Sequence, residues 1–263
     1  MPIALIIGCG DIALGAARLI GKRHPLLLAD IDAARLETAA AMLVREGFTV
    51  TSAVCDVTQR EDVKRLAGLA AMAGGIDELA HVAALAPSAG DWRLMMRVNL
   101  AGPALTAELL LPLCVPGGAA VYVSSVAGHL AKSTPALDAV LDEPLASGFL
   151  EILAGSAAMD PSLAYQLSKH ALIRASRRWA VQHGPRNVRV LSVSPGLVQS
   201  AMGARERLHN PASAGLADIT PLRREANVQE IAAVIDFAVS PAASFLTGTD
   251  ILADGGLTAA SAR

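Results

Sequence analysis

Seven short apolar segments recur along the chain, with longer segments of helical spacing between them. The apolar segments cover Ile3 to Ile7, Leu26 to Ala29, Val50 to Val54, Leu79 to Ala83, Ala119 to Val123, Val188 to Val193 and Ile251 to Ala253. Their apolar residues are continuous rather than alternating, which is typical of strands covered on both faces in a parallel sheet. The segments between them, such as Ala33 to Glu46, Arg60 to Ala73 and Val228 to Val239, carry Ala, Leu, Arg and Glu at helix-compatible spacing. This alternation predicts an α/β fold, namely a Rossmann-type, doubly wound and mostly parallel sheet of seven strands with helices on both faces.

The 263 residues contain no long linker-like tract, which favours one domain over residues 1–263. Two stretches lack a clear strand or helix pattern. We interpret residues 131–161 as an inserted segment of short amphipathic helices, and residues 200–222 as a substrate-binding loop.

Composition and charge exclude several classes of protein. The formal net charge of −2 provides no basic field for a phosphate backbone, so we expect no nucleic-acid partner. The N-terminus runs from Met1 into an apolar segment too short for a signal sequence or a membrane span, which favours a cytoplasmic protein without a membrane partner. Cys9, Cys55 and Cys114 lie in or beside apolar segments without a C-x-x-C pair or a histidine cluster, so we expect reduced core residues and no metal site.

A glycine-rich turn follows the first predicted strand directly. The residues G-C-G-D-I-A-L-G, with Gly8, Gly10 and Gly15, open the next helix. Glycines there let the backbone turn tightly and approach a pyrophosphate at the positive end of the helix. Such a run also serves close packing of a strand on a helix, so this signal alone leaves both interpretations open.

An acidic residue at the end of the second strand favours a dinucleotide. Asp30 ends L-L-L-A-D, at about the spacing where a carboxylate accepts hydrogen bonds from the adenosine ribose hydroxyls. The carboxylate would repel a 2′-phosphate, and the next residue, Ile31, supplies no cation, so we predict NAD rather than NADP. The alternative is that Asp30 or Asp32 caps the following helix. Asp56, in C-D-V-T after the third strand, is suited to the adenine amino group or to capping the helix that starts near Gln59.

The candidate chemistry lies in Y-Q-L-S-K, where Tyr165 and Lys169 are four residues apart and share one helix face. Ser124 and Ser125 follow the fifth strand. A tyrosine and a lysine at this spacing often mark only a solvated helix face, so the pair needs the context of the other motifs.

With those motifs, the chain resembles the short-chain dehydrogenase/reductase family over essentially its whole length. The matching order is the glycine turn, Asp30, C-D-V-T, R-V-N-L, V-S-S-V-A-G, Y-Q-L-S-K, S-P-G-L-V-Q-S and T-G-T-D-I-L-A-D-G-G. The resemblance implies catalytic roles for Asn99, Ser125, Tyr165 and Lys169. It implies cofactor contacts from Gly8, Gly10, Asp11, Ile12, Asp30, Ile31, Asp56, Val57, Ala83, Ala84, Tyr165, Lys169, Pro195, Gly196, Val198 and Ser200.

The implied activity is an NAD-dependent oxidoreductase that interconverts a secondary alcohol and a ketone by hydride transfer. A free phenol has a pKa of about 10, and a nearby Lys169 ammonium and the positive nicotinamide favour its phenolate. Tyr165 then acts as acid and base, while Ser125 stabilises the developing oxyanion. Lys169 would also hold the nicotinamide ribose, and Asn99 would support a water chain from Lys169 to solvent, although Asn99 by itself also suits a helix kink or cap.

Three departures from the family pattern touch functional parts. The glycine turn is one residue longer than T-G-x-x-x-G-x-G and lacks its threonine, although G-C-G-D-I-A fits the general dinucleotide fingerprint. H-V-A-A at His81 to Ala84 replaces the usual N-N-A-G, and we interpret His81 as structural. The separation of Ser125 from Tyr165 is enlarged, as in bacterial 3α-hydroxysteroid dehydrogenase/carbonyl reductases, which favours a bulky ketone or a hydroxysteroid-like substrate.

Two other functions compete with this one. An epimerase or dehydratase would use the same scaffold, and a non-catalytic NAD-binding regulator would explain the altered glycine turn. For assembly we expect a homo-oligomer, a dimer or a tetramer, with residues 131–161 at a subunit boundary. The alternative is that this insertion covers the substrate mouth, because its apolar side chains must be buried somewhere.

Overall fold

Seven parallel strands form the central sheet of the computed structural model, which describes residues 1–209 and 215–261. The strands are β1 (Ile3–Ile7), β2 (Leu26–Asp30), β3 (Val50–Val54), β4 (Ile76–His81), β5 (Cys114–Val123), β6 (Arg189–Pro195) and β9 (Asp250–Ala253). Their order is β3–β2–β1–β4–β5–β6–β9, and every neighbouring pair is parallel. The sequence prediction of a seven-stranded, doubly wound sheet is therefore confirmed.

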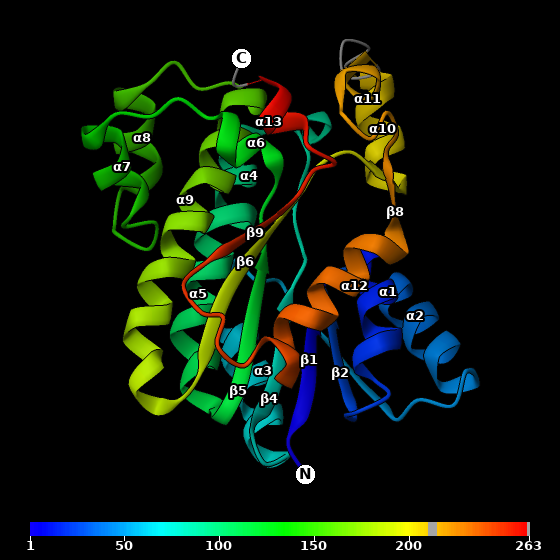
Figure 1. The fold of residues 1–263 in the computed structure, drawn as a ribbon. Coiled ribbons are helices and arrows are strands. Elements are labelled where there is room, and N and C mark those ends of the chain that lie inside the picture. The colour runs from blue at the N-terminus through cyan, green and yellow to red at the C-terminus, as the bar shows by residue number, and fades with distance from the viewer. Residues whose placement is uncertain (210–214, 262–263) are drawn as a thin grey trace.

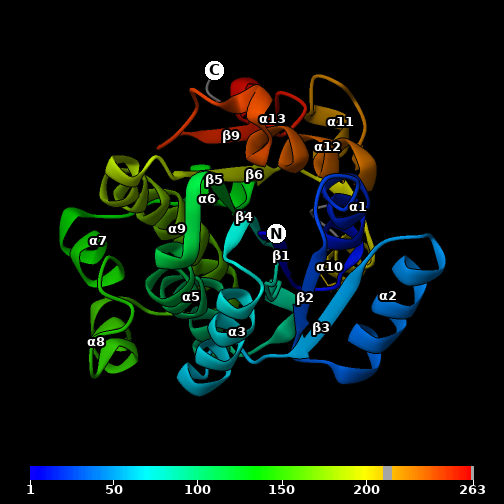
Figure 2. The same ribbon diagram turned by 90° about the horizontal axis from the view of Figure 1, so that it is seen from below.

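Helices cover both faces of the sheet (Figures 1 and 2). One face carries α1 (Asp11–Ile20), α2 (Ala33–Arg45) and α12 (Val228–Val239), and the other carries α3 (Arg60–Met72), α5 (Gly102–Leu110) and α9 (Pro161–His183). Successive strand residues point to opposite faces, so Ile6 packs in the core beneath α1 and α12, while Leu5 packs in the core beneath α3 and α9. The predicted helices over 33–46, 60–73 and 228–239 agree with the structure to within one residue.

The strand β3 differs from the prediction that strands are covered on both faces. It lies at the edge of the sheet, and Thr51, Ser52 and Val54 are exposed. An edge strand has only one neighbour and is flanked by fewer helices. Apolar composition alone therefore overestimated the burial of this segment.

Short elements connect the main ones. They are η1 (Pro87–Ala89), α4 (Trp92–Met96), the π-helical turn η2 (Arg97–Ala101), η3 (Leu111–Leu113), α6 (Val126–Leu130), α7 (Pro135–Leu141), α8 (Phe149–Ser156), η4 (Gly184–Arg186), β7 (Val198–Gln199), α10 (Ala201–His209), α11 (Leu216–Ile219), β8 (Ala226–Asn227), η6 (Pro241–Ala243) and α13 (Leu257–Ser261). Residues 210–214 of the predicted loop over 200–222 lie outside the described residues.

Helices α7 and α8, within residues 131–161, pack on the outer side of α9 (Figure 1). Leu141 and Leu153 are fully buried there, in a cluster that also contains Leu167 of α9. Ion pairs reinforce the contact, because Asp142 accepts bonds from both Arg174 (2.7 Å) and Arg178 (2.6 Å). The apolar side chains of this insertion are thus largely buried within the chain itself.

The remaining composition-based expectations concern cysteines and membrane spans. Cys9, Cys55 and Cys114 are buried and unpaired, and burial raises the pKa of each thiol to about 12. One helical stretch, Trp92–Leu113, is long and apolar enough to cross a membrane by length and composition. Since 67% of its window is buried inside the protein, it has the character of a core helix.

Candidate active site

The predicted site residues gather at the carboxyl ends of the parallel strands, the upper end of the sheet in Figure 1. The glycine turn follows β1, Asp30 ends β2, Ala83 follows β4, Ser125 follows β5 and Pro195 ends β6. In doubly wound sheets this edge is where ligands bind. Residues that are far apart in the sequence are therefore brought to one place by the topology.

The glycine turn after β1 has the geometry that a bound pyrophosphate requires. Gly8 has a φ of +101°, and a Cβ at this position would lie 2.8 Å from the backbone nitrogen of Ala83. A Cβ on Gly10, by contrast, would meet nothing within 4 Å, so the approach to the start of α1 is open. Gly10 also precedes α1 without a capping side chain, which leaves backbone N–H groups of the first turn available to an anion. The lengthened turn thus still fits the phosphates of a dinucleotide.

Hydrogen bonds hold the predicted cofactor residues after β6, and one of them connects this segment with the start of α1. The Asp11 carboxylate accepts a 2.7 Å bond from the backbone N–H of Ala201, at the start of α10. The Ser200 hydroxyl accepts from the Gly203 N–H at 3.1 Å, and the Gly196 N–H donates to the Ala253 carbonyl at 2.9 Å. Ser200, for which the resemblance implies a cofactor contact, therefore also stabilises the first turn of α10.

Asp30 is buried and held rigidly by the backbone. The Cys9 N–H donates to Asp30 Oδ2 at 2.7 Å, and the Asp32 N–H donates to Asp30 Oδ1 at 2.9 Å. Each carboxylate oxygen thus has one backbone partner and retains acceptor capacity for a hydroxyl. Ile31 is 63% exposed. The predicted N-cap role belongs to Asp32, whose side chain accepts from the Arg35 N–H at 3.0 Å.

A cation that the sequence reasoning missed lies beside Asp30. The guanidinium Nη1 of Arg35 is 3.9 Å from Asp30 Oδ2. The prediction of NAD considered only Ile31, the next residue in sequence, and overlooked a side chain in the first turn of α2. The signal that would have found it is the position of Arg35 in the first turn of the predicted helix over 33–46, because helical side chains lean towards the N-terminus of the helix and thus towards the strand end.

Asp56 is engaged by its own turn. Its Oδ1 accepts from the Thr58 N–H at 2.9 Å and from the Thr58 hydroxyl at 2.8 Å. The prediction that Asp56 caps the following helix is wrong, because the N-cap of α3 is Gln59 and no side chain caps that helix. Asp56 instead stabilises the turn before α3 through one carboxylate oxygen, and the predicted adenine contact stays a prediction. The neighbouring Val57 is buried against Gly102 of α5.

The four expected catalytic residues lie on three adjacent elements. Tyr165 and Lys169 belong to the first half of α9, Ser125 precedes α6, and Asn99 lies in the π-helical turn η2. Lys169 Nζ donates to the Val123 carbonyl at 2.9 Å and lies 5.8 Å from the centre of the Tyr165 ring. A hydrogen bond with Ser125 favours the phenolate of Tyr165.

The Ser124 hydroxyl has a structural partner, since it donates to the Lys169 carbonyl at 2.8 Å. The Ser125 hydroxyl instead accepts from the Ala127 N–H at 3.2 Å and remains able to donate towards Tyr165. This division of contacts matches the expectation that Ser125, rather than Ser124, faces the chemistry.

Burial shifts the pKa values of both Tyr165 and Lys169. Burial raises the pKa of the Tyr165 phenol, and the hydrogen bond with Ser125 opposes that rise only in part. Burial also lowers the pKa of Lys169 to about 7. In the sequence prediction the Lys169 ammonium and the positive nicotinamide together favour the phenolate. Because the low-dielectric interior disfavours both the phenolate and the ammonium, that prediction depends on the nicotinamide charge as well as on Lys169.

Glu206 is a second residue that the sequence analysis did not identify. Its carboxylate raises the pKa of Tyr165 by charge repulsion, and its Oε2 accepts from the Ser88 N–H at 3.2 Å. The bond connects α10 with η1 near Tyr165. Residues 200–222 carry no periodic pattern, so no sequence signal pointed to this side chain.

Asn99 pairs with one backbone unit through both ends of its amide. Its Nδ2 donates to the Leu85 carbonyl at 2.9 Å, and its Oδ1 accepts from the Leu85 N–H at 2.8 Å. The side chain is fully buried. Asn99 therefore fixes the segment after β4 against η2, and its amide groups already have partners.

His81 takes the place of an expected asparagine. It is buried and stacks on Tyr122 with ring centres 5.6 Å apart, and its Nε2 has no hydrogen-bond partner among the described residues. Burial, together with the charge of Lys169, lowers the pKa of His81 to about 3. A neutral imidazole packed in the core agrees with the structural interpretation.

Comparisons with known proteins extend this picture. Residues 2–136 match the family model described as short chain dehydrogenase, and residues 149–258 match the one described as enoyl-(acyl carrier protein) reductase. The chain belongs to the short-chain dehydrogenase/reductase family. Members of this family use nicotinamide cofactors.

Several relatives align with nearly the full length of the chain. The chain is 31% identical to the short-chain dehydrogenase/reductase bsc3 of Alternaria brassicicola, over 98% of this chain and 96% of that one. It is 30% identical to the 3-alpha-hydroxysteroid dehydrogenase/carbonyl reductase of Comamonas testosteroni, over 98% and 97%. A short-chain type dehydrogenase/reductase from Mycobacterium ulcerans superposes with a TM-score of 0.80 at 23% identity, covering 98% of this chain and 90% of that one. The resemblance inferred from the motifs is therefore confirmed.

Proposed function

We propose that this oxidoreductase interconverts a secondary alcohol and a ketone with NAD as cofactor and Tyr165 as the acid and base. The observation that carries the proposal is the meeting of Ser125, Tyr165 and Lys169 at the strand edge that also holds the glycine turn and Asp30. A non-catalytic binding protein would have no need of this convergence.

Each residue has a role that follows from its contacts. The nicotinamide ring, when bound, accepts or supplies the hydride. Tyr165 removes the hydroxyl proton of the alcohol, or returns it to the ketone oxygen in the reverse direction. Ser125 donates a hydrogen bond to the oxygen on which negative charge develops. Lys169 binds the nicotinamide ribose and stabilises the phenolate once the positive nicotinamide lies beside it.

The pH dependence of oxidation follows from the raised pKa of Tyr165. Oxidation needs the phenolate, whose fraction is small at pH 7 and grows as pH rises towards the pKa. We expect kcat/KM for alcohol oxidation to rise between pH 7 and 9.5, by less than about tenfold per pH unit, because Lys169, with a pKa of about 7, loses its supporting charge over the same range. Ketone reduction, which needs the protonated phenol, stays nearly flat at neutral pH. Initial rates in both directions test this, and a fall in the oxidation rate over that range would contradict the assignment of Tyr165 as the base.

The choice of NAD rests on the charge around the adenosine ribose position. The carboxylates of Asp30 and Asp32 lie there with one guanidinium, that of Arg35. The net charge of these two carboxylates and the guanidinium is negative. The Asp30 carboxylate is also buried and held by two backbone N–H groups. A 2′-phosphate adds further negative charge to this environment, whereas two ribose hydroxyls supply donors to it.

Replacing Asp30 by alanine tests the cofactor assignment. We expect the unmodified protein to bind NAD+ at least about tenfold more tightly than NADP+, since one pair of hydroxyl-to-carboxylate hydrogen bonds contributes more than 1.4 kcal/mol. The Asp30→Ala variant is expected to lose most of this difference. Dissociation constants from calorimetric titration measure it, with Asp218→Ala in α11 as an exposed control. Equal or tighter binding of NADP+ by the unmodified protein would refute the choice of NAD.

Substrate, assembly and location complete the proposal. The cluster that buries the insertion extends to Tyr165, so residues 131–161 support the wall of the site from outside. The family relative from Comamonas testosteroni is named for hydroxysteroid and carbonyl substrates, and we propose a bulky ketone as the substrate of this protein.

We also propose a cytoplasmic homo-oligomer in which the outer face of the insertion, with exposed Leu145 and Ile152, lies at a subunit boundary.

A further inference from the structure

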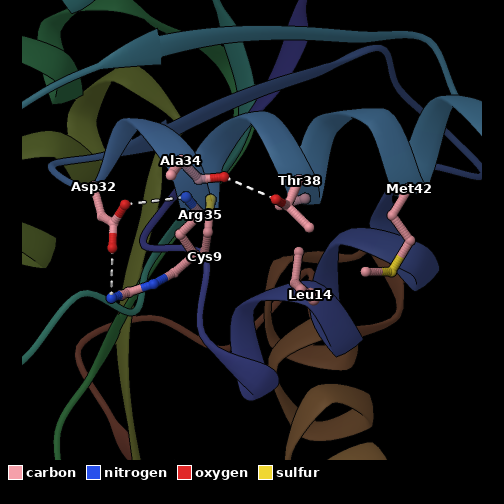
Figure 3. Close-up of a pocket in the computed structure, with 8 residues that line it drawn as sticks. Cys9, Leu14, Asp32, Ala34, Arg35, Thr38 and Met42 are labelled. Atoms are coloured by element: carbon pink, nitrogen blue, oxygen red, sulfur yellow. Dashed lines mark hydrogen bonds and ion pairs between the residues drawn. The ribbon is translucent and has the colours of Figure 1, made fainter.

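A hollow of about 300 Å³ lies between α1 and α2, beside the end of β2 (Figure 3). Apolar side chains such as Leu14 and Met42 form one side of it. Asp32, Arg35 and Thr38 provide its polar side chains. The Thr38 hydroxyl already donates to the Ala34 carbonyl at 2.8 Å, so Arg35 is the lining side chain with donors for an anion.

Asp32 holds the Arg35 side chain by two contacts. Its Oδ1 accepts the Arg35 backbone N–H at 3.0 Å, and its Oδ2 accepts from the guanidinium Nη2 at 3.1 Å, as the dashed lines of Figure 3 show. The first contact caps α2 and the second draws the guanidinium back over the helix start. Both side chains are partly exposed, at 54% for Arg35 and 42% for Asp32. Such a pair is weak and can exchange partners.

The Arg35 guanidinium lies beside the proposed position of the adenosine ribose, where it can affect the choice between NAD and NADP. Its Nη1 is 3.9 Å from the carboxylate of Asp30, the group that we propose for the adenosine ribose. A guanidinium binds phosphate through paired N–H donors better than any other side chain does. The chain thus carries a phosphate-binding group next to the ribose position, and that group is paired with a carboxylate.

We propose that Asp32 is a specificity-determining residue, because its carboxylate holds Arg35 and withholds that guanidinium from the 2′-phosphate of NADP. This inference rests on the proposed function, in which the adenosine ribose lies at Asp30. It assigns the preference for NAD to two carboxylates with different tasks. Asp30 receives the ribose hydroxyls, and Asp32 neutralises the guanidinium of Arg35, which would favour a phosphate in their place.

The substitution Asp32→Asn tests the proposal without removing the helix cap, because asparagine retains the side-chain oxygen that accepts the Arg35 N–H. We expect the variant to bind NADP+ about fivefold more tightly than the unmodified protein, the scale of a partly exposed charge pair, with NAD+ affinity changed less than twofold. Equilibrium titration with each dinucleotide, monitored by calorimetry, provides both values. A thermal unfolding midpoint close to that of the unmodified protein shows that the cap persists.

The same substitution in an Arg35→Met variant distinguishes two causes of a gain in NADP+ affinity: release of the Arg35 guanidinium and the mere loss of one negative charge. In Arg35→Met, the further change Asp32→Asn should give no gain in NADP+ affinity. A gain of equal size in both backgrounds, or no gain in the single variant, would overturn the role of Asp32. Tighter binding of NADP+ than of NAD+ by the unmodified protein would instead refute the proposed NAD preference, and the comparison of the two backgrounds would still decide the role of Asp32.

Discussion

Replacement of Tyr165 by phenylalanine is expected to lower kcat by about 10³-fold, within the range that a positioned acid or base contributes, and to leave the dissociation constant of NAD+ within twofold. The change removes one hydroxyl, which is the group proposed to exchange a proton with the substrate. The aromatic ring, which packs against the cluster beneath the insertion, is kept. Steady-state rates together with calorimetric titration of NAD+ measure the two effects separately.

Tyr122 supplies a matched control, because the chain has only two tyrosines. Its ring is fully buried and packs against His81 and Trp179. The Tyr122→Phe variant also loses one phenolic hydroxyl and should retain turnover within a fewfold. Wild-type turnover in Tyr165→Phe, or an equal loss in both variants, would show that the Tyr165 hydroxyl is not the acid and base.

Replacement of Lys169 by alanine is expected to damage both turnover and cofactor binding. Its ammonium is proposed to serve the phenolate and the nicotinamide ribose together, so its loss should lower kcat/KM by about 10²-fold or more and weaken NAD+ binding about tenfold, as for one charge-assisted hydrogen bond. The side chain also donates to the Val123 carbonyl. The same rates and titrations as for Tyr165 measure the outcome.

Lys64 provides the control for that change, since it lies on α3 in an exposed ion pair with Glu61. The Lys64→Ala variant should match the unmodified protein in both measurements. If Lys169→Ala lost turnover but bound NAD+ normally, the ribose role would be wrong. A circular dichroism spectrum and unfolding midpoint near those of the unmodified protein establish that the variant is folded.

The strands and the order of the motifs could be predicted because they depend on local pattern. A continuous apolar run such as Ile3 to Ile7 can be buried on both faces only within a covered sheet. A parallel sheet then places every strand end at one edge, so Asp30 and Ser125 could be expected together from their positions after strands. The spacing of Tyr165 and Lys169 places them on one face of a helix, and the other motifs of the chain then gave that pair its meaning.

Contacts between elements could not be predicted in the same way. Arg35 returns to Asp30 only because Asp32 caps α2, and Glu206 reaches η1 from a segment without periodicity. The direction of the pKa shift of Tyr165 depends on how deeply α9 is buried, which the motif does not encode. Pairing of both amide groups of Asn99 with Leu85 likewise depends on the path of the chain after β4.

The most direct test of the proposed function follows the absorbance of the reduced nicotinamide while the protein is mixed with a panel of secondary alcohols and NAD+, or of ketones and NADH. Bulky cyclic and steroid-like compounds belong in the panel beside small linear ones. The proposed function predicts that at least one alcohol and ketone pair is interconverted, with NAD(H) preferred over NADP(H), and that Tyr165→Phe abolishes the signal while Tyr122→Phe retains it. Tight binding of NAD+ with no absorbance change across the panel, or a signal that persists in Tyr165→Phe, would contradict it.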